Sequence, residues 1–213
     1  MDIVFIIKKI LTEPDGIKKL LITGAISLIP IFGALYLLGW VCAVTERADG
    51  GYSSVLPELN IPGCLKDGAL LALGFLTYNL PILVLYGLKR LLEFCFTHWV
   101  PSGAGKVLCG ILNGLSAVIG TLWLFLFLFL VPVLIHLFIR RHDFRDIVDF
   151  GRVYRFCVKH VHELLSPLAM LCVVLTTAAS GFSLLMVGIL LTIPLSFAFY
   201  GYRIGRQELF LQL

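Results

Sequence analysis

Long apolar stretches separated by short polar segments dominate the chain. They cover residues 17–44, 67–97, 105–139 and 165–205. An α-helix rises about 1.5 Å per residue and the hydrocarbon core of a bilayer is about 30 Å thick, so about 20 apolar residues are enough to cross it. The pattern therefore predicts an all-α integral membrane protein, with the whole chain, 1–213, as a single transmembrane domain.

The first two stretches predict one transmembrane helix each. Residues 17–44 are expected to form the first span, and a kink would fall near Pro30, because proline removes a backbone N–H from the helix. Residues 67–88 are expected to form the second span and to continue as an interfacial tail toward Trp99.

The last two stretches are long for a single crossing, since each would measure about 50 Å or more as one helix. Residues 105–139 and 165–205 are therefore each expected to form a hairpin of two spans, with turns near Gly120 and in 178–183. This interpretation gives about six transmembrane helices. Five remain the alternative, in which 105–139 forms one long tilted helix.

Two polar segments are expected to lie in the membrane interface. Residues 1–13 are predicted to form a short interfacial helix, because their lysines follow the apolar run. Residues 45–66 contain paired glycines and two prolines, which favour turns, and are expected to cap the bundle. The turn of this cap would be built on Arg47, Pro57 and Glu58, with Glu58 reaching back to Arg47.

Residues 144–164 predict an amphipathic helix. At 100° per residue, one face is apolar and carries Phe144, Ile147, Gly151, Tyr154, Val158 and Val161. The opposite face is basic and carries Arg145, Arg152 and Lys159. We expect this helix to lie along the negatively charged cytoplasmic leaflet. Because its aromatic rings are on the apolar face, no nucleic-acid partner is expected.

The distribution of Lys and Arg predicts the orientation, because cytoplasmic loops collect these residues. With six crossings and a cytoplasmic N-terminus, fifteen of the 17 basic residues lie inside, and only Arg47 and Lys66 lie outside. Five crossings give a split of ten to seven. We therefore expect a multi-pass protein of the cell membrane with both termini in the cytoplasm.

Composition supports the membrane class and argues against an enzyme. The chain is 59% hydrophobic and only 14% charged, with a mean hydropathy of +0.98. All 13 acidic residues lie outside the apolar cores, which argues against proton-coupled transport. The six cysteines form no C-x-x-C pair, and His160 and His162 point apart on a helix. We expect no catalytic site, no metal and no cofactor.

A few residues inside the apolar stretches are candidates for a cavity or for contacts between helices: Asn79, Pro81, Asn113 and His136. Pro81 frees a backbone carbonyl, and Asn79 can form a hydrogen bond to a neighbouring helix. His136 lies near the end of an apolar stretch, where a hydrogen bond at the helix end is expected. Ligation of a haem or chlorophyll by His136 is the alternative.

Five segments resemble, in their order, a known membrane family. They read EPDGIKKLLITGAISLIPIFG, GWVCAVTERADGGYSSVLPELN, LKDGALLALGFLTYNLP, FRDIVDFGRVYRFCVKHVHELL and IPLSFAFYGYRIGRQEL. This order is similar to the bacterial and archaeal family labelled domain of unknown function 4013, over nearly the whole chain. At 205–207 the chain has GRQ where the family usually has small residues and Gly-Gln. The resemblance implies a small polytopic helical protein and brings no catalytic residues or substrate.

These observations favour two roles. The first is a non-enzymatic scaffold or accessory subunit, which contacts the lipid bilayer and either other membrane protein subunits or further copies of itself. The second is a permease, exporter or binder for an apolar or lipid-like solute. Its lining would be the region of Asn79 and Pro81, together with Asn113, Thr176 and Thr177.

Overall fold

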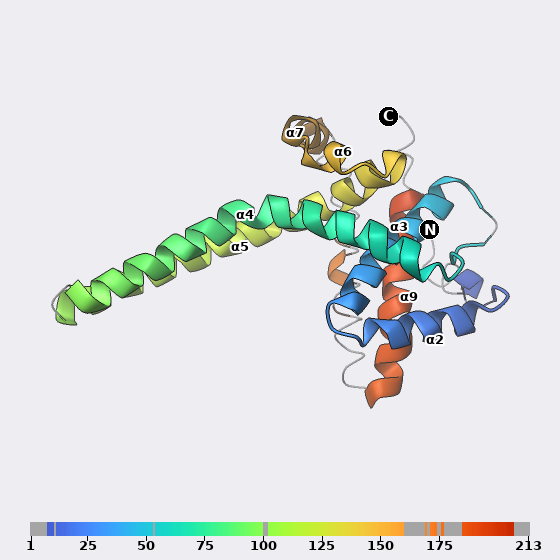
Figure 1. Ribbon diagram of the computed structural model, residues 1–213, viewed down its shortest axis with the longest axis horizontal. Coiled ribbons are helices and arrows are strands. Elements are labelled where there is room, and N and C mark those ends of the chain that lie inside the picture. The colour runs from blue at the N-terminus through green and yellow to red at the C-terminus, as the bar shows by residue number, and fades with distance from the viewer. Residues whose placement is uncertain are drawn as a thin grey trace.

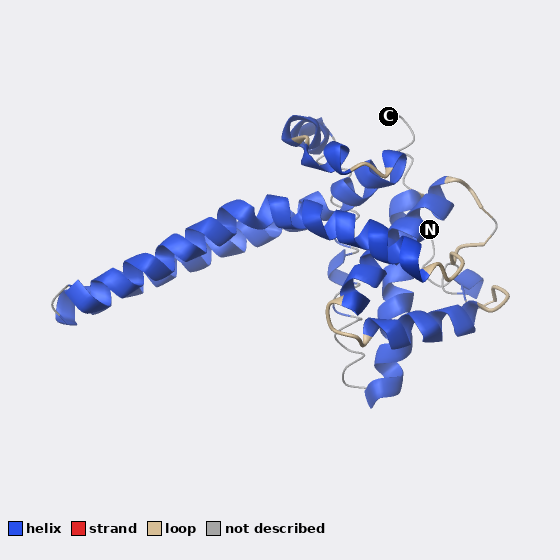
Figure 2. Cartoon of the chain, viewed as in Figure 1, coloured by secondary structure: helices blue, strands red, loops and turns tan. Residues whose placement is uncertain are grey.

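The described part of the protein is helical. The computed structural model describes residues 8–10, 12–52, 54–99, 102–159, 169, 171–173, 176 and 185–206, and no strand occurs among them. The helices are α2 (Gly16–Ser27), α3 (Phe32–Asp49), α4 (Ile61–Trp99), α5 (Ser102–Arg141), α6 (Phe144–Val148), α7 (Phe150–Lys159) and α9 (Leu185–Gly205). Among the described residues, short turns join α2 to α3, α5 to α6 and α6 to α7, and a longer loop joins α3 to α4 (Figure 2). The predicted all-α class is confirmed for this part of the chain.

α3 lies in the bundle between α4 and α9 (Figure 1). Glycines bring α3 and α4 together, because a Cβ at Gly39 would overlap the carbonyl oxygen of Cys64. A Cβ at Gly68 would likewise overlap the carbonyl oxygen of Leu35. The two contacts advance in opposite directions along the chain, so α3 and α4 pack antiparallel with their backbones touching. Small residues at helix contacts are typical of packing in membranes.

α3 and α9 pack in parallel, and glycines again bring the two backbones into contact. Gly201 lies against the carbonyl of Val41, and Gly205 lies against that of Thr45. Both contacts advance by four residues in the same direction along the two helices. Large side chains fill the rest of the core, including the fully buried Tyr36, Trp40, Phe138 and Tyr200.

Residues 17–44 form two helices and not one, and the break between α2 and α3 falls at Pro30, where the sequence predicted a kink. Ile31 adopts a positive φ of 67°, and the amide of Gly33 donates to the carbonyl of Ile29 in the turn. Pro30 lacks an amide hydrogen and so gives no helical hydrogen bond after the end of α2 at Ser27. With 12 residues, α2 is about 18 Å long, which is short for a full crossing.

The turn predicted near Gly120 is also wrong, and the alternative of one long helix holds. α5 runs without interruption for 40 residues from Ser102 to Arg141. Gly120 costs little inside a helix whose backbone hydrogen bonds remain intact, and the tyrosine ring of Tyr86 packs over it. Lys106 and Arg140 therefore lie near opposite ends of one helix, which contradicts the six-crossing assignment that put both on the cytoplasmic side.

α4 and α5 form a long antiparallel hairpin. Three contacts fix its register: Tyr86 to Ser116, Asn79 to Trp123, and Phe75 to Phe127. The steps between them are equal on both helices and opposite in direction, so the register is constant. α4 also begins earlier than the predicted second span and continues through the expected interfacial tail to Trp99.

Half of this hairpin projects from the bundle (Figure 1). The buried residues of α4 lie between Cys64 and Ile82, and the buried large residues of α5 lie between Val133 and Ile139. We call the remainder, residues 83–99 and 102–126, the arm. Both α4 and α5 are long and apolar enough to cross a membrane.

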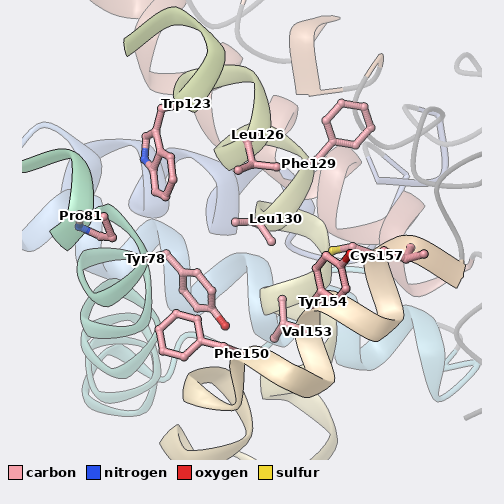
Figure 3. Close-up of a pocket in the computed structure, with 11 residues that line it drawn as sticks. Tyr78, Pro81, Trp123, Leu126, Phe129, Leu130, Phe150, Val153, Tyr154 and Cys157 are labelled. Atoms are coloured by element: carbon pink, nitrogen blue, oxygen red, sulfur yellow. The ribbon is translucent and has the colours of Figure 1, made fainter. Parts of the chain in front are cut away.

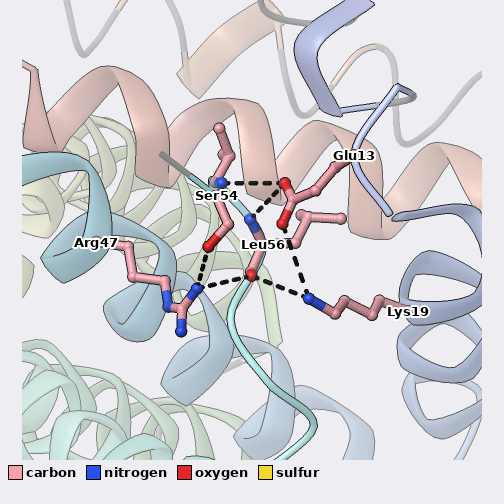
Figure 4. A network of polar contacts seen from close by, with 6 residues as sticks. Glu13, Lys19, Arg47, Ser54 and Leu56 are labelled. Carbon is pink, nitrogen blue, oxygen red and sulfur yellow. Dashed lines mark hydrogen bonds and ion pairs between the residues drawn. The ribbon is translucent and has the colours of Figure 1, made fainter. Parts of the chain in front are cut away.

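The segment after α3 folds back onto the bundle through a polar network (Figure 4). The Glu13 carboxylate accepts hydrogen bonds from the amides of Val55 and Leu56 at 3.0 and 3.1 Å. Lys19 and Arg47 donate to the carbonyl of Leu56 at 3.3 and 3.2 Å. The network ties the start of α2, the end of α3 and the loop before α4 to one another.

The amphipathic segment forms two helices instead of one. α6 ends at Val148, and Asp149 caps α7, with its carboxylate accepting the amide of Arg152 at 3.1 Å. The break shifts the helical phase, so the predicted apolar face is wrong after Ile147. Val153 and Phe156 are the buried residues of α7, whereas Tyr154 is 70% exposed.

Several predictions fall outside the described residues. These include the turn at 178–183, the end of the amphipathic segment at 160–164 with His160 and His162, and most of the interfacial helix at 1–7. α9 covers the second half of the predicted 165–205 hairpin.

Candidate functional site

An apolar groove lies between α4, α5 and α7 (Figure 3). Its volume is about 620 Å³. It is lined by Tyr78, Pro81, Trp123, Leu126, Phe129, Leu130, Phe150, Val153, Tyr154, Cys157 and Val158. A cavity of this size is in the range of small-molecule sites, which extends from about 300 to 1,000 Å³.

The polar groups of Tyr78 and Trp123, on the α4 and α5 walls of the groove, are paired within the protein. The Tyr78 hydroxyl donates to the carbonyl of Ile147 at 2.8 Å. The Trp123 indole donates to the side-chain oxygen of Asn79 at 3.3 Å, and the Asn79 amide donates to the carbonyl of Phe75 at 2.8 Å. The groove therefore presents hydrocarbon and aromatic surface to any occupant.

Aromatic contacts hold the walls of the groove together. The rings of Tyr78 and Phe150 lie 4.8 Å apart and join α4 to α7. The rings of Phe75 and Phe127 meet edge to face at 5.6 Å and join α4 to α5. Edge-to-face and tilted pairs are favoured arrangements for aromatic rings.

The expected interhelical bond of Asn79 is present, and its partner is Trp123. Pro81 lies two residues further along α4, on the wall of the groove. Asn113 is elsewhere, because the constant register of the hairpin places it across from Lys89, and its side chain is exposed. Asn79 and Asn113 therefore do not line one cavity.

His136 is buried in the bundle and does not line the groove. Its ring stacks over Phe156, with 6.4 Å between the ring centroids. This contact joins α5 to the buried face of α7. Ligation of a haem or chlorophyll by His136 stays a prediction.

The three basic residues predicted to share a face are all exposed. Arg145 lies on α6, and Arg152 and Lys159 lie on α7. Arg155 is exposed as well, and its Nε donates to the carbonyl of Gly151 at 3.2 Å. α7 thus carries an apolar wall of the groove on one side and three cations on the other.

The cap turn uses a different partner from the one expected. Arg47 donates to the hydroxyl of Ser54 and to the carbonyl of Leu56, while Glu58 is exposed. Leu56, and not Glu58, is therefore the residue that Arg47 holds across the turn. Pro57 is buried.

A contact missed by the sequence analysis joins three helices at His142. Its Nε2 lies 3.8 Å from Glu46 and its Nδ1 lies 3.8 Å from Asp67. The three residues are far apart in the sequence, and only the antiparallel packing of α3 and α4 brings them together. Among the described residues, no group of three His, Cys, Asp or Glu side chains is arranged to hold a metal ion.

The groove itself was also missed, although the aromatic run of 122–130 was a signal of an apolar surface. Its walls come from residues 78–81, 123–130 and 150–158, and sequence separation hides such a contact. The helix break at Asp149 turns Phe150 and Tyr154 toward this space.

Comparison with known proteins gives one match. The model of a family described as protein of unknown function (DUF4013) matches residues 22–193. No curated protein and no solved structure matches the chain.

Proposed function

The chain belongs to the DUF4013 family, and we propose that it is a non-enzymatic scaffold or accessory subunit of a larger membrane complex. The observation that carries this proposal is the arm, which projects from the bundle with exposed apolar side chains on both helices (Figure 1). Large side chains such as Leu91, Ile111 and Leu122 are each more than 60% exposed. Such a surface suits the apolar faces of other transmembrane helices.

A face of small residues on α5 supports close helix contacts along the arm. Gly110, Gly114, Ala117 and Thr121 are separated by four, three and four positions, which places them on one side of the helix. All four are exposed, and no atom of the protein lies near the space that a Cβ at Gly110 or Gly114 would occupy. Small residues of this spacing let helix backbones approach in membranes.

The proposed location is the cell membrane, with several crossings and both termini in the cytoplasm. The position of Lys9 supports termini on one side, because its ammonium lies 5.6 Å from the centroid of the Tyr202 ring. Arg206, at the end of α9, lies 5.8 Å from the same ring. The basic residues of both ends would then face one leaflet, as the charge rule for cytoplasmic segments requires.

Purification in mild detergent tests the role of an accessory subunit. The wild-type chain is expected to purify with another membrane protein in a fixed ratio. The double variant Gly110→Leu with Gly114→Leu should lose that partner, because the added side chains block a close approach without meeting any atom of the chain itself.

Gly87→Leu is the matched control for this experiment. Gly87 also lies on the arm with open space around it, but on α4. It should keep the partner. Purification of the wild-type chain alone, in a single copy, would contradict the proposal.

A permease or exporter of an apolar solute is the second candidate function, and the groove is the observation that favours it. Transport would require the solute to cross the bilayer through the protein. Uptake or export of a labelled lipid-like solute in vesicles containing only this chain would support this second function.

A further inference from the structure

The volume of the groove favours a ligand that is thinner than an α-helix. One turn of an α-helix, with a pitch of about 5.4 Å and a diameter of about 10 Å, occupies roughly 400 Å³. The groove, with about 620 Å³, therefore holds less than two turns. A partner helix would therefore contact the groove over less than two turns, whereas one flexible hydrocarbon chain can follow and fill it.

The lining of the groove favours an occupant made of hydrocarbon. Two of the polar groups in the lining, the Tyr78 hydroxyl and the Trp123 indole, already donate to Ile147 and Asn79, and the rest of the lining is apolar apart from Tyr154 and Cys157 (Figure 3). An occupant with its own polar groups would leave them unpaired in this space, which is costly. The part of the occupant inside the groove is therefore apolar.

The positive charge of α7 indicates that the part of the occupant outside the groove is negatively charged. Arg152, Arg155 and Lys159 are exposed, and α7 contains no acidic residue. Arg155 lies about 60° around the helix from Val158, at the edge of the groove, because three residues advance a helix by almost one turn. A negatively charged group next to the apolar occupant would meet this basic edge.

We propose that the groove holds one acyl chain of an anionic phospholipid, whose headgroup lies against the basic edge of α7 formed by Arg155 and Lys159. The lipid joins α7 to the α4–α5 hairpin beside the point where the arm begins. This inference is independent of both proposed functions, because a bound lipid can serve a scaffold or a transporter.

Quenching of Trp123 by brominated lipids tests the proposal in the full chain. The protein has three tryptophans, of which Trp40 is fully buried and Trp99 is 84% exposed. The Trp99→Phe variant leaves Trp123 as the tryptophan at the groove. It is placed in phosphatidylcholine vesicles with a minor fraction of phospholipid brominated in the acyl chain, as either phosphatidylglycerol or phosphatidylcholine.

We expect brominated phosphatidylglycerol to associate with the Trp123 site about tenfold more strongly than brominated phosphatidylcholine, because the basic edge attracts only the anionic headgroup. Equal quenching by the two lipids would overturn the proposal, since Trp123 would then report contact with bulk lipid only.

Two variants and their controls locate the lipid. In the same background, Val158→Phe fills the groove and should abolish the preference, while Val118→Phe, at an equally exposed site on the arm, should keep it. Arg155→Gln with Lys159→Gln should also abolish it, while Arg90→Gln with Lys106→Gln on the arm should not. A preference that survives Val158→Phe, or that the arm variants remove equally, would overturn the proposal.

Discussion

At the scale of single residues, Asn79 is the polar group whose role is clearest. Its side-chain amide donates a hydrogen bond to the carbonyl of Phe75 in its own helix, and its side-chain oxygen accepts one from the indole of Trp123 on α5. Both atoms would otherwise meet hydrocarbon. The side chain therefore sets the register of the hairpin at the point where the groove begins.

A double-mutant cycle on Asn79 and Trp123 should reveal their coupling. Asn79→Leu and Trp123→Phe are each expected to lower the free energy of unfolding, and the coupling should be about 0.6 kcal/mol, as for hydrogen bonds between helices in membranes. Denaturant unfolding in mild detergent measures it. Strictly additive effects would mean that the bond contributes nothing to stability.

Other residue contacts were beyond prediction from the sequence. The pairing of Arg47 with the carbonyl of Leu56 was missed because a backbone acceptor leaves no signal in the side-chain pattern. His142 was placed before a helix, but its approach to Glu46 and Asp67 depends on how α3, α4 and α5 pack. The partner of Asn79 could be anticipated in kind, though not in identity.

At the scale of helices, glycine contacts decide which pairs of elements lie closest. Gly39 and Gly68 allow the backbones of α3 and α4 to touch. By contrast, Gly87, Gly103, Gly110 and Gly114 on the arm face open space. The same residue type thus serves two different purposes in one protein.

Alanine substitutions should separate these two kinds of glycine. Gly39→Ala is expected to destabilise the protein by about 1–3 kcal/mol, since its Cβ would overlap the Cys64 carbonyl. Gly87→Ala, in open space, should be neutral or stabilise by up to about 1 kcal/mol through helix propensity. Thermal unfolding of both variants in one detergent makes the comparison. Equal destabilisation would contradict the packing of α3 on α4.

Helical class was predictable, but helix ends were not. The length of the apolar stretches predicted helices in the regions of 61–99 and 102–141. The turn at Gly120 was predicted because a helix of 35 residues is longer than a bilayer is thick. Glycine permits a turn but does not require one. The backbone hydrogen bonds of α5 continue through Gly120, so the helix is not interrupted there. In contrast, Pro30 and the positive φ of Ile31 end a helix that apolar composition alone would continue.

The amphipathic segment shows why a face cannot be assigned across a break. Its predicted stripe assumed one continuous helix from 144 to 164. Asp149 interrupts it and caps α7, so the phase changes and Val153 and Phe156 become the buried residues. The basic side chains on both sides of the break, Arg145 on α6 and Arg152, Arg155 and Lys159 on α7, are exposed despite the change of phase.

At the scale of the whole molecule, the two described ends of the chain meet. Lys9 and Arg206 approach the same ring, Tyr202, from opposite ends of the sequence. Reporter fusions at the two termini should therefore give the same signal, and we expect it to be cytoplasmic. A cytoplasmic signal at one end with an exported signal at the other would contradict this arrangement.

The whole molecule combines a bundle, which holds the groove, with an arm that the bundle does not cover. Midway along the arm, Lys89 and Arg90 each approach Glu93 at 3.5 Å. The apolar part between the tip and the bundle is the surface offered to other helices in the membrane.

Site-specific photo-crosslinking in native membranes tests docking of the arm most directly. A photoreactive amino acid at position 117, on the small-residue face of α5, should give one adduct with a defined membrane protein, or with a second copy if the arm pairs with itself. The same group at position 154, in the groove, should give lipid adducts instead. Lipid adducts alone at position 117 would contradict the proposed role of the arm.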